Sequence, residues 1–136
     1  MKNTNLIKTG ERLLGKTAIV TGAGSGLGQA SAIHFAAQGA RVMCADISEA
    51  AAQATAQLIA ENPSFEKASF IKADVSEEKS NEMMVTKTLD TFGRVDILFA
   101  NADVPGAGSV TTTTKNEWDR VIGVNLTGVF LSNKAV

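Results

Sequence analysis

The chain contains 136 residues, which corresponds to about one domain or less. Thirteen basic and fourteen acidic residues give a formal net charge of −1, and this balance excludes a strongly basic surface for nucleic acid. Hydrophobic residues make up 44% of the chain, which is enough for a packed core and too much for a disordered protein. The single cysteine excludes a disulfide framework and a cysteine zinc cluster.

The N-terminal residues 1–15 are polar and lack the apolar stretch of a secretory signal. No apolar run approaches the ~18 residues that a membrane span needs. We therefore expect a cytoplasmic protein without membrane or nucleic-acid partners. Cys44 lies in an apolar run and is expected to be a small buried side chain.

Short apolar segments alternate with helical patterns along the whole chain. The pattern predicts, in chain order, strand 16–20, helix 26–38 ended by Gly39, strand 41–45, a helix capped by Ser48 and ended at Pro63, strand 68–73, a helix opened by Ser76 and ended by Gly93, and strand 95–100. A loop rich in Gly and Thr follows over residues 103–114. Thr114 and Glu117 form a capping box that predicts a last helix continuing to the end of the chain.

Strands and helices that alternate at this spacing predict right-handed βαβ units and hence an α/β fold with a parallel sheet. The strands are continuously apolar instead of alternating, which is typical of strands covered by helices on both faces. No internal repeat or low-complexity linker divides the chain.

A glycine cluster follows the first strand in the sequence Thr21-Gly-Ala-Gly-Ser-Gly-Leu-Gly28, which holds four of the twelve glycines. Glycines at a strand-to-helix turn let the backbone turn tightly and approach a bulky anion. The free N–H groups and the positive dipole end of the following helix favour the same guest. The cluster therefore predicts a diphosphate site, although a tight turn without a ligand remains an alternative.

The spacing of these glycines distinguishes two kinds of nucleotide site. The common pattern G-x-G-x-x-G fails, since Leu27 and Gln29 stand where it needs glycine. The pattern T-G-x-x-x-G-x-G fits from Thr21. A methyltransferase-type G-x-G-x-G also fits, but Val20 stands where that motif usually has an acid.

Two acidic residues follow the second and third predicted strands. Asp46 lies 18 residues after Gly28, where an acid accepts hydrogen bonds from the adenosine ribose and repels a 2′-phosphate. The cluster itself contains no Lys or Arg, so the pattern favours NAD over NADP. Asp74 and Val75 are placed to meet the adenine amino group and one face of the ring. The alternative for both acids is a polar residue that merely flanks the next helix.

Together these residues resemble the NAD-preferring short-chain dehydrogenase/reductase family. Further motifs carry the likeness: Leu14-Gly-Lys-Thr-Ala-Ile-Val20 before the glycines, Phe92-Gly-Arg-Val-Asp-Ile-Leu98 before Ala100-Asn-Ala102, and Val124-Asn-Leu-Thr-Gly128 in the last helix. The motifs span the whole chain in the order of the family. The resemblance implies a Rossmann-type doubly wound sheet of strand order 3-2-1-4, with residues 1–136 as the incomplete N-terminal part of one NAD-binding domain.

The resemblance also implies roles for particular residues. It places Gly22, Ser25, Gly26 and Leu27 along the pyrophosphate, Asp46 and Ile47 at the adenosine ribose, Asp74 and Val75 at the adenine, and Ala100, Asn101 and Ala102 at the nicotinamide-side ribose. It assigns Asn125 to the catalytic tetrad, where it helps to order a proton-relay water. It implies an alcohol or ketone as substrate and a homo-oligomer, and it implies no metal.

Asn125 is also unusual within the predicted helix. It lies in a stripe with Trp118, Ile122 and Val129, and an amide in an apolar stripe is costly to bury unpaired. It therefore binds backbone or water structurally, or it serves a site. Gly123 weakens the same helix, which is consistent with close packing.

The chain departs from the family pattern at Ala100, where an Asn is usual, and at Asp103, where a Gly is usual. Aspartate tolerates positive φ less well than glycine and adds negative charge beside the cofactor. The family's Ser and Tyr-x-x-x-Lys do not occur, and the chain contains no tyrosine, so we expect residues 1–136 alone to be inactive. Ser132 and Lys134 lie on the helix of Asn125 and are not assigned to catalysis. His34 lies inside the first helix and is expected at the surface.

Two other functions remain open at this point. The chain acts as a truncated nucleotide-binding or protein-interaction module, or it binds adenosine in the manner of a methyltransferase. Strand 95–100 is expected at the edge of the sheet, where unpaired backbone invites association with another chain. We therefore expect the isolated chain to be marginally stable, to associate or to aggregate.

Overall fold

The computed structural model describes residues 9–136. Residues 1–8, part of the segment in which no secretory signal was found, lie outside the described residues. The elements are β1 (Thr17–Thr21), α1 (Gly26–Ala37), β2 (Arg41–Asp46), α2 (Glu49–Ala60), β3 (Ala68–Lys72), α3 (Glu78–Phe92), β4 (Ile97–Phe99), α4 (Lys115–Ile122), the π-helical turn η2 (Gly123–Thr127) and α5 (Gly128–Ala135).

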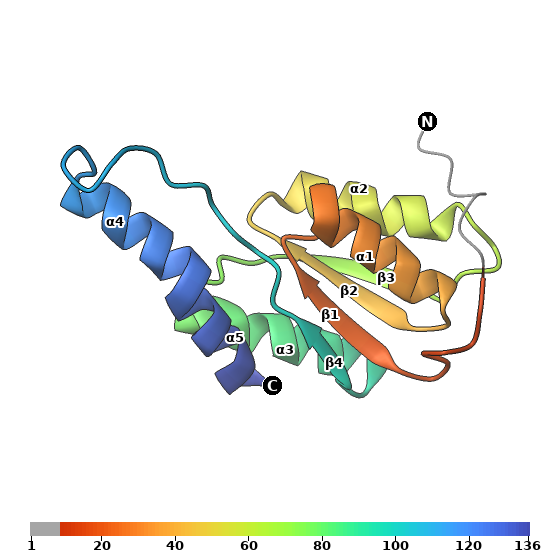
Figure 1. The fold of residues 1–136 in the computed structure, drawn as a ribbon. Helices are drawn as coiled ribbons and strands as arrows, with labels where there is room; N and C mark the ends of the chain where they lie inside the picture. Colours follow the sequence, from red (N-terminus) through yellow and green to blue (C-terminus); the bar gives the residue numbers. More distant parts are fainter. Residues whose placement is uncertain (1–8) are drawn as a thin grey trace.

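The four strands form one parallel sheet in the order β3-β2-β1-β4. β1 lies in the middle, where Val20 is opposite Cys44 of β2 on one side and Phe99 of β4 on the other. Helices α1 and α2 cover one face of the sheet and α3 lies against the other (Figure 1). The predicted Rossmann-type fold and its strand order are therefore confirmed. Within the described residues β4 pairs on one side only, as expected for an edge strand.

The two central strands are buried on both faces, so their side chains divide between two cores. Val20 and Cys44 pack with small residues of α1 and α2, whereas Ile19 and Met43 pack with Met84 of α3. Burial raises the pKa of the Cys44 thiol to about 12, so it stays neutral at physiological pH and acts as a small hydrophobic side chain.

Two predicted boundaries are wrong for local reasons. The fourth strand contains three residues, because Asp96 uses its carboxylate to accept a hydrogen bond from the Thr17 backbone N–H at 2.8 Å before the regular ladder begins. Helix α3 begins at Glu78, with Glu77 and not Ser76 at its N-cap. The Ser76 hydroxyl instead donates to the Asp74 carboxylate at 2.6 Å.

The last helix contains one irregularity. It begins as expected, with the Thr114 hydroxyl accepting from the Glu117 backbone N–H at 3.1 Å, and it continues through the five residues of η2. We call α4, η2 and α5 the C-terminal arm (residues 115–135). The arm packs against the body, by which we mean the sheet with helices α1 to α3, through contacts of α5 with α3. Helix α4 buries none of its residues (Figure 1). The predicted continuous last helix is therefore confirmed, and the π-helical turn at its centre is a feature that the sequence pattern did not predict.

Two smaller expectations concern the surface of the described residues. His34 is exposed on α1, as expected for a residue away from the strand ends. None of the helices within residues 9–136 is both long enough and apolar enough to cross a membrane.

Candidate nucleotide-binding site

The carboxyl ends of the strands border one open cleft of about 330 Å³. Its walls come from the loops after all four strands and from η2. The lining residues are Gly22, Ser25, Gly26, Leu27, Gly28, Asp46, Ile47, Ala73, Asp74, Val75, Asn101, Ala102, Asp103, Val104 and Val124. Ten of the eleven residues expected at a cofactor thus lie around one cavity. Ala100 is not among the lining residues, because it is the half-buried residue between β4 and Asn101.

The glycine loop is packed too closely for side chains at Gly22, Gly24 and Gly28. Gly22 has φ +65°, and a Cβ there would lie 2.9 Å from the Ala102 Cα. A Cβ at Gly28 would collide with the Gly22 carbonyl. The first glycine therefore permits the turn, and the last lets α1 pack against the loop that precedes it.

Helix α1 presents its N-terminus to this cleft. Ser25 is the N-cap residue but makes no side-chain capping hydrogen bond, and the first turn of α1 contains no acidic residue. The first N–H groups of a helix have no intrahelical partner, and the helix dipole makes this end positive. The loop and the helix together therefore suit the diphosphate of a nucleotide.

Asp46 joins two of the loops that border the cleft. One carboxylate oxygen accepts from the Gly24 backbone N–H at 2.8 Å and the other from the Ser48 backbone N–H at 2.9 Å. Each oxygen has more than one acceptor position, so the carboxylate retains capacity for ribose hydroxyl groups. Asp46 thus flanks the start of α2, and it also borders the cleft. Its position is therefore compatible both with a helix-flanking role and with a role at the ribose.

Asp74 organises the next loop in a similar way. Its Oδ1 accepts from the backbone N–H of Ser76 at 3.0 Å and from its hydroxyl at 2.6 Å. Its Oδ2 has no hydrogen-bond partner among residues 9–136 and is available for an amino group. Val75, 7% exposed, lies beside it in the cleft wall.

Thr21, the first residue of the glycine motif, joins the end of β1 to the segment after β4 at the cleft. Its hydroxyl accepts from the backbone N–H groups of both Asn101 and Ala102 at 3.0 Å. The Asn101 side chain returns a hydrogen bond to the Thr21 carbonyl at 3.1 Å. These three bonds fix the segment after β4 against the glycine loop.

A second support lies beneath the glycine loop and was not found from the sequence. The buried Thr55 hydroxyl donates to the Ala23 carbonyl at 2.8 Å, and the Gln29 amide donates to the same hydroxyl at 3.0 Å. The sequence feature that could have indicated this support is the threonine in the alanine-rich stretch 49–60. A threonine that is fully buried needs a hydrogen-bond partner.

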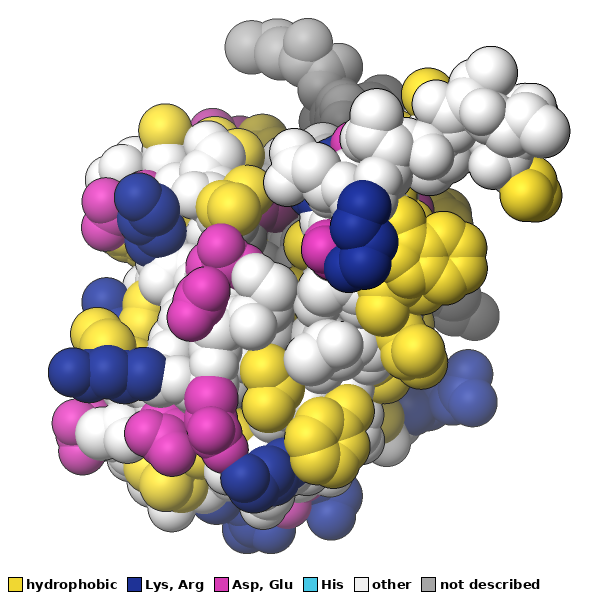
Figure 2. Space-filling model, turned by 90° about the vertical axis from the view of Figure 1, so that its left-hand side faces the viewer, with side chains coloured by type: hydrophobic (Ala, Val, Ile, Leu, Met, Phe, Trp, Pro, Cys, Tyr) yellow, Lys and Arg dark blue, Asp and Glu magenta, His cyan; other side chains and the backbone are white. Residues whose placement is uncertain are grey.

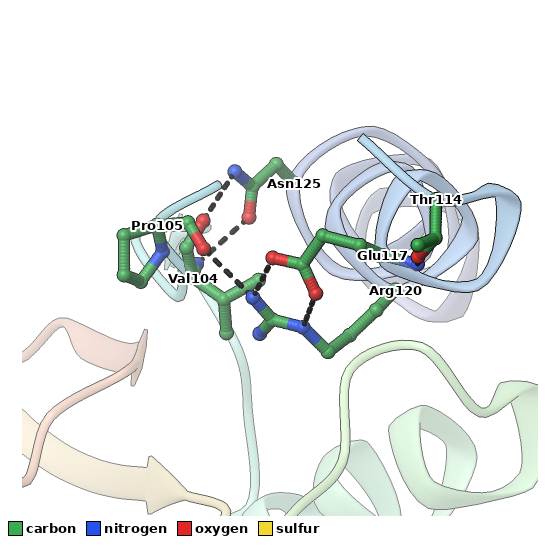
Figure 3. A network of polar contacts seen from close by, with 6 residues as sticks. All are labelled: Val104, Pro105, Thr114, Glu117, Arg120 and Asn125. Carbon is green, nitrogen blue, oxygen red and sulfur yellow. Dashed lines mark hydrogen bonds and ion pairs between the residues drawn. The ribbon is translucent and has the colours of Figure 1, made fainter. Parts of the chain in front are cut away.

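Asn125 lies on η2 and faces the loop after β4 (Figure 3). Its Oδ1 accepts from the Val104 backbone N–H at 2.8 Å, and its Nδ2 donates to the Val104 carbonyl at 2.9 Å. Arg120 holds the same loop by donating to the Pro105 carbonyl at 2.7 Å. Asn125 is exposed and does not line the cleft, so the structure realises the backbone-binding alternative. π-turns of this kind occur frequently at functional sites.

The carboxylates at the cleft bear on the choice of ligand. Asp46, Asp74 and Asp103 line it, and no Lys or Arg of residues 9–136 does. No residue other than glycine within residues 9–136 has positive φ, so Asp103 adopts an ordinary backbone conformation. Replacement of the family's glycine therefore introduces no backbone strain here, and its remaining effect is the added negative charge.

A parallel α/β sheet with a glycine loop at its first crossover defines a nucleotide-binding class of protein, and comparison with known proteins defines the family. The family model "short chain dehydrogenase" matches residues 16–136. The chain belongs to the short-chain dehydrogenase/reductase family of oxidoreductases.

Individual relatives agree with this assignment. An uncharacterised oxidoreductase of Thermotoga maritima is 42% identical over 120 residues, covering 88% of this chain and 46% of the relative. Levodione reductase of Leifsonia aquatica is 37% identical over 126 residues, covering 92% of this chain and 47% of that protein. A short chain dehydrogenase from Mycobacterium smegmatis has a similar structure, with a TM-score of 0.90 and 32% identity over 95% of this chain and 54% of the other.

The chain spans about half the length of the curated relatives it matches. Family membership and fold imply a nicotinamide nucleotide as cofactor. The methyltransferase alternative receives no support from these matches.

Proposed function

We propose that residues 1–136 are the N-terminal part of the NAD-binding domain of a cytoplasmic, homo-oligomeric dehydrogenase or reductase that acts on an alcohol or ketone. The glycine loop and the N-terminus of α1 would hold the pyrophosphate, through Gly22, Ser25, Gly26 and Leu27. Asp46 and Ile47 would contact the adenosine ribose, Asp74 and Val75 the adenine, and Ala100, Asn101 and Ala102 the nicotinamide side. When bound, the nicotinamide ring supplies the hydride acceptor or donor.

The observation that carries the preference for NAD is the position of Asp46. Its carboxylate borders the cleft and is held by two backbone N–H groups, which fixes its orientation. A ribose with free hydroxyls would donate to this carboxylate, whereas a 2′-phosphate would be repelled by it. Among the described residues the cleft lining contains no Lys or Arg, which supports the same preference.

Asn125 is proposed as a catalytic residue of the full-length enzyme. Its two hydrogen bonds to the Val104 backbone use one of the two amide hydrogens and one acceptor position of Oδ1. The remaining capacity would bind a water that relays a proton. We propose that residues 1–136 alone are inactive, since the chain has no tyrosine to act as general acid.

The proposal is tested by calorimetric titration of the 136-residue chain with NAD and NADP. We expect NAD to bind more tightly by tenfold or more, since hydrogen bonds to a charged group contribute about 1.5–3 kcal/mol. Asp46→Asn keeps an oxygen for the Gly24 N–H but removes the charge, so it should reduce the preference for NAD. Asp90→Asn, an exposed change on α3, is the matched control and should behave as wild type.

The ratio of the two affinities separates the possible roles of Asp46. If Asp46→Asn weakens NAD and NADP by the same factor, Asp46 supports the loop and does not select the cofactor. If the wild-type chain binds neither nucleotide, the chain acts only through protein contacts, and the proposal fails.

A further inference from the structure

A buried pair of polar side chains joins the C-terminal arm to the loop that carries Val75. Asn81 of α3 and Ser132 of α5 are each 1% exposed, and the Ser132 hydroxyl donates to the Asn81 Oδ1 at 2.7 Å. The Asn81 Nδ2 donates to the Val75 carbonyl at 2.8 Å and to the Glu77 carbonyl at 2.9 Å. The Asn81 side chain therefore uses Oδ1 to bind α5, and both Nδ2 hydrogens to bind the loop that precedes α3.

The same loop contacts the arm directly at Gly128. A Cβ at Gly128 would lie 2.7 Å from the Val75 Cγ2, so only glycine lets the first residue of α5 approach this closely. Val75 is thereby packed between the cleft and α5. Its backbone is held by Asn81 and its side chain by Gly128, so its position depends on where α5 sits.

Little else fixes α5 to the body. The remaining bond between α5 and α3 is the ion pair of Lys134 with Glu78, in which both side chains are more than half exposed. Exposed ion pairs contribute little, whereas a buried oxygen left without its donor costs much more. The Asn81–Ser132 contact is consequently the specific polar tie between α5 and the loop that carries Val75, whereas Asn125 and Arg120 join the rest of the arm to the loop after β4.

We propose that Asn81 is a positioning residue of the nucleotide site, which holds Val75 against the adenine through a hydrogen bond that Ser132 completes from the arm. This inference rests on the proposed nucleotide function. It makes adenine affinity dependent on a residue that does not line the cleft, and it connects the adenine end of the site to the helical segment that carries Asn125.

The experiment measures the affinity of the 136-residue chain for AMP and for NAD, together with its thermal midpoint. Ser132→Ala should raise the Kd of both ligands by the same factor, about three- to tenfold, because Asn81 loses the hydrogen bond that completes its hold on Val75. Asn81→Val should act in the same direction and more strongly. Ser132→Thr keeps the hydroxyl and should stay within about twofold of wild type. Asn133→Ala, an exposed change on the same helix, is the control.

The outcomes separate this inference from the proposed function. If Ser132→Ala lowers the thermal midpoint but leaves the Kd of AMP unchanged, the pair is only structural and the inference is wrong. If Asn133→Ala weakens AMP as much as Ser132→Ala does, the effect is a general loosening of α5, and the inference is also wrong. If wild type binds neither AMP nor NAD, the proposed function itself fails and the inference falls with it.

Discussion

The sheet with α1 to α3 and the C-terminal arm are built in opposite ways. Every residue of β1 is buried, and Thr21, Asp46 and Thr55 hold the loops around the cleft through hydrogen bonds. The arm exposes large apolar side chains, namely Trp118, Leu126, Val129 and Phe130. Figure 2 looks onto the side where the arm lies and shows hydrophobic side chains at the surface. The body is stabilised by its own core, whereas the arm depends on a few specific contacts.

The largest difference is expected in the free energy of unfolding, between truncating a buried apolar side chain of the body and truncating an exposed one of the arm. Ile19→Ala removes a fully buried side chain and should lower the free energy of unfolding by about 2–5 kcal/mol. Phe130→Ala, at a residue 62% exposed, should change it by less than about 0.5 kcal/mol. Chemical denaturation followed by circular dichroism measures both. Equal effects would show that the arm is as tightly packed as the body.

Association should be the next largest effect. We expect the isolated chain to sediment as oligomers or aggregates, because β4 is an edge strand and the arm exposes apolar side chains. Substitution of Leu126 and Phe130 by Asn should reduce the sedimenting mass if the arm contributes. A stable monomer with a cooperative thermal transition would contradict the expectation for both regions.

Substituting one glycine in each region should also have different effects on stability. Gly28→Ala would place a Cβ against the Gly22 carbonyl and should destabilise the chain by about 1–3 kcal/mol while weakening NAD. Gly123→Ala has helical φ and ψ, with its nearest neighbour 3.9 Å away, and should be neutral or stabilising by up to ~1 kcal/mol. Thermal unfolding and NAD titration check both changes. A destabilising Gly123→Ala would mean that η2 requires glycine.

The smallest expected effect is a pH dependence. The Arg94 side chain and then the Thr17 N–H hold the pKa of Asp96 below its ordinary value of 3.8. The folded chain therefore binds this proton less readily than the unfolded chain, so the stabilisation is complete above pH ~4 and is lost as pH falls through the folded pKa. In Asp96→Asn the free energy of unfolding should fall less steeply as the pH is lowered below about 4, and denaturation at each pH measures this. An unchanged pH dependence would show that the contact contributes nothing.

The parts of the fold that local patterns determine were predicted from the sequence. The Ser48 cap is confirmed, because its hydroxyl accepts from the Ala51 N–H, and Gly93 ends α3 with φ +80°. The glycine loop and Asp46 lie at one cleft because the carboxyl ends of parallel strands meet at one edge of a sheet.

The features that escaped prediction depend on residues far apart in the chain. Asn81 and Ser132 are 51 positions apart, and Thr21 binds the segment after β4 across 80 positions. No local pattern marks such partners. The pairing of Asn125 with the backbone of Val104 likewise joins two separate segments, 21 positions apart in the chain.

The central claim is that the loops after the four strands form the adenosine half of an NAD site, and it is tested most directly by an NMR titration of the 136-residue chain with NAD. We predict that the backbone amide signals of Gly22, Gly26, Ser48 and Val75 shift, whereas that of the exposed Phe130 does not. Shifts confined to the arm, or no shift at the glycine loop at saturating NAD, would contradict the claim.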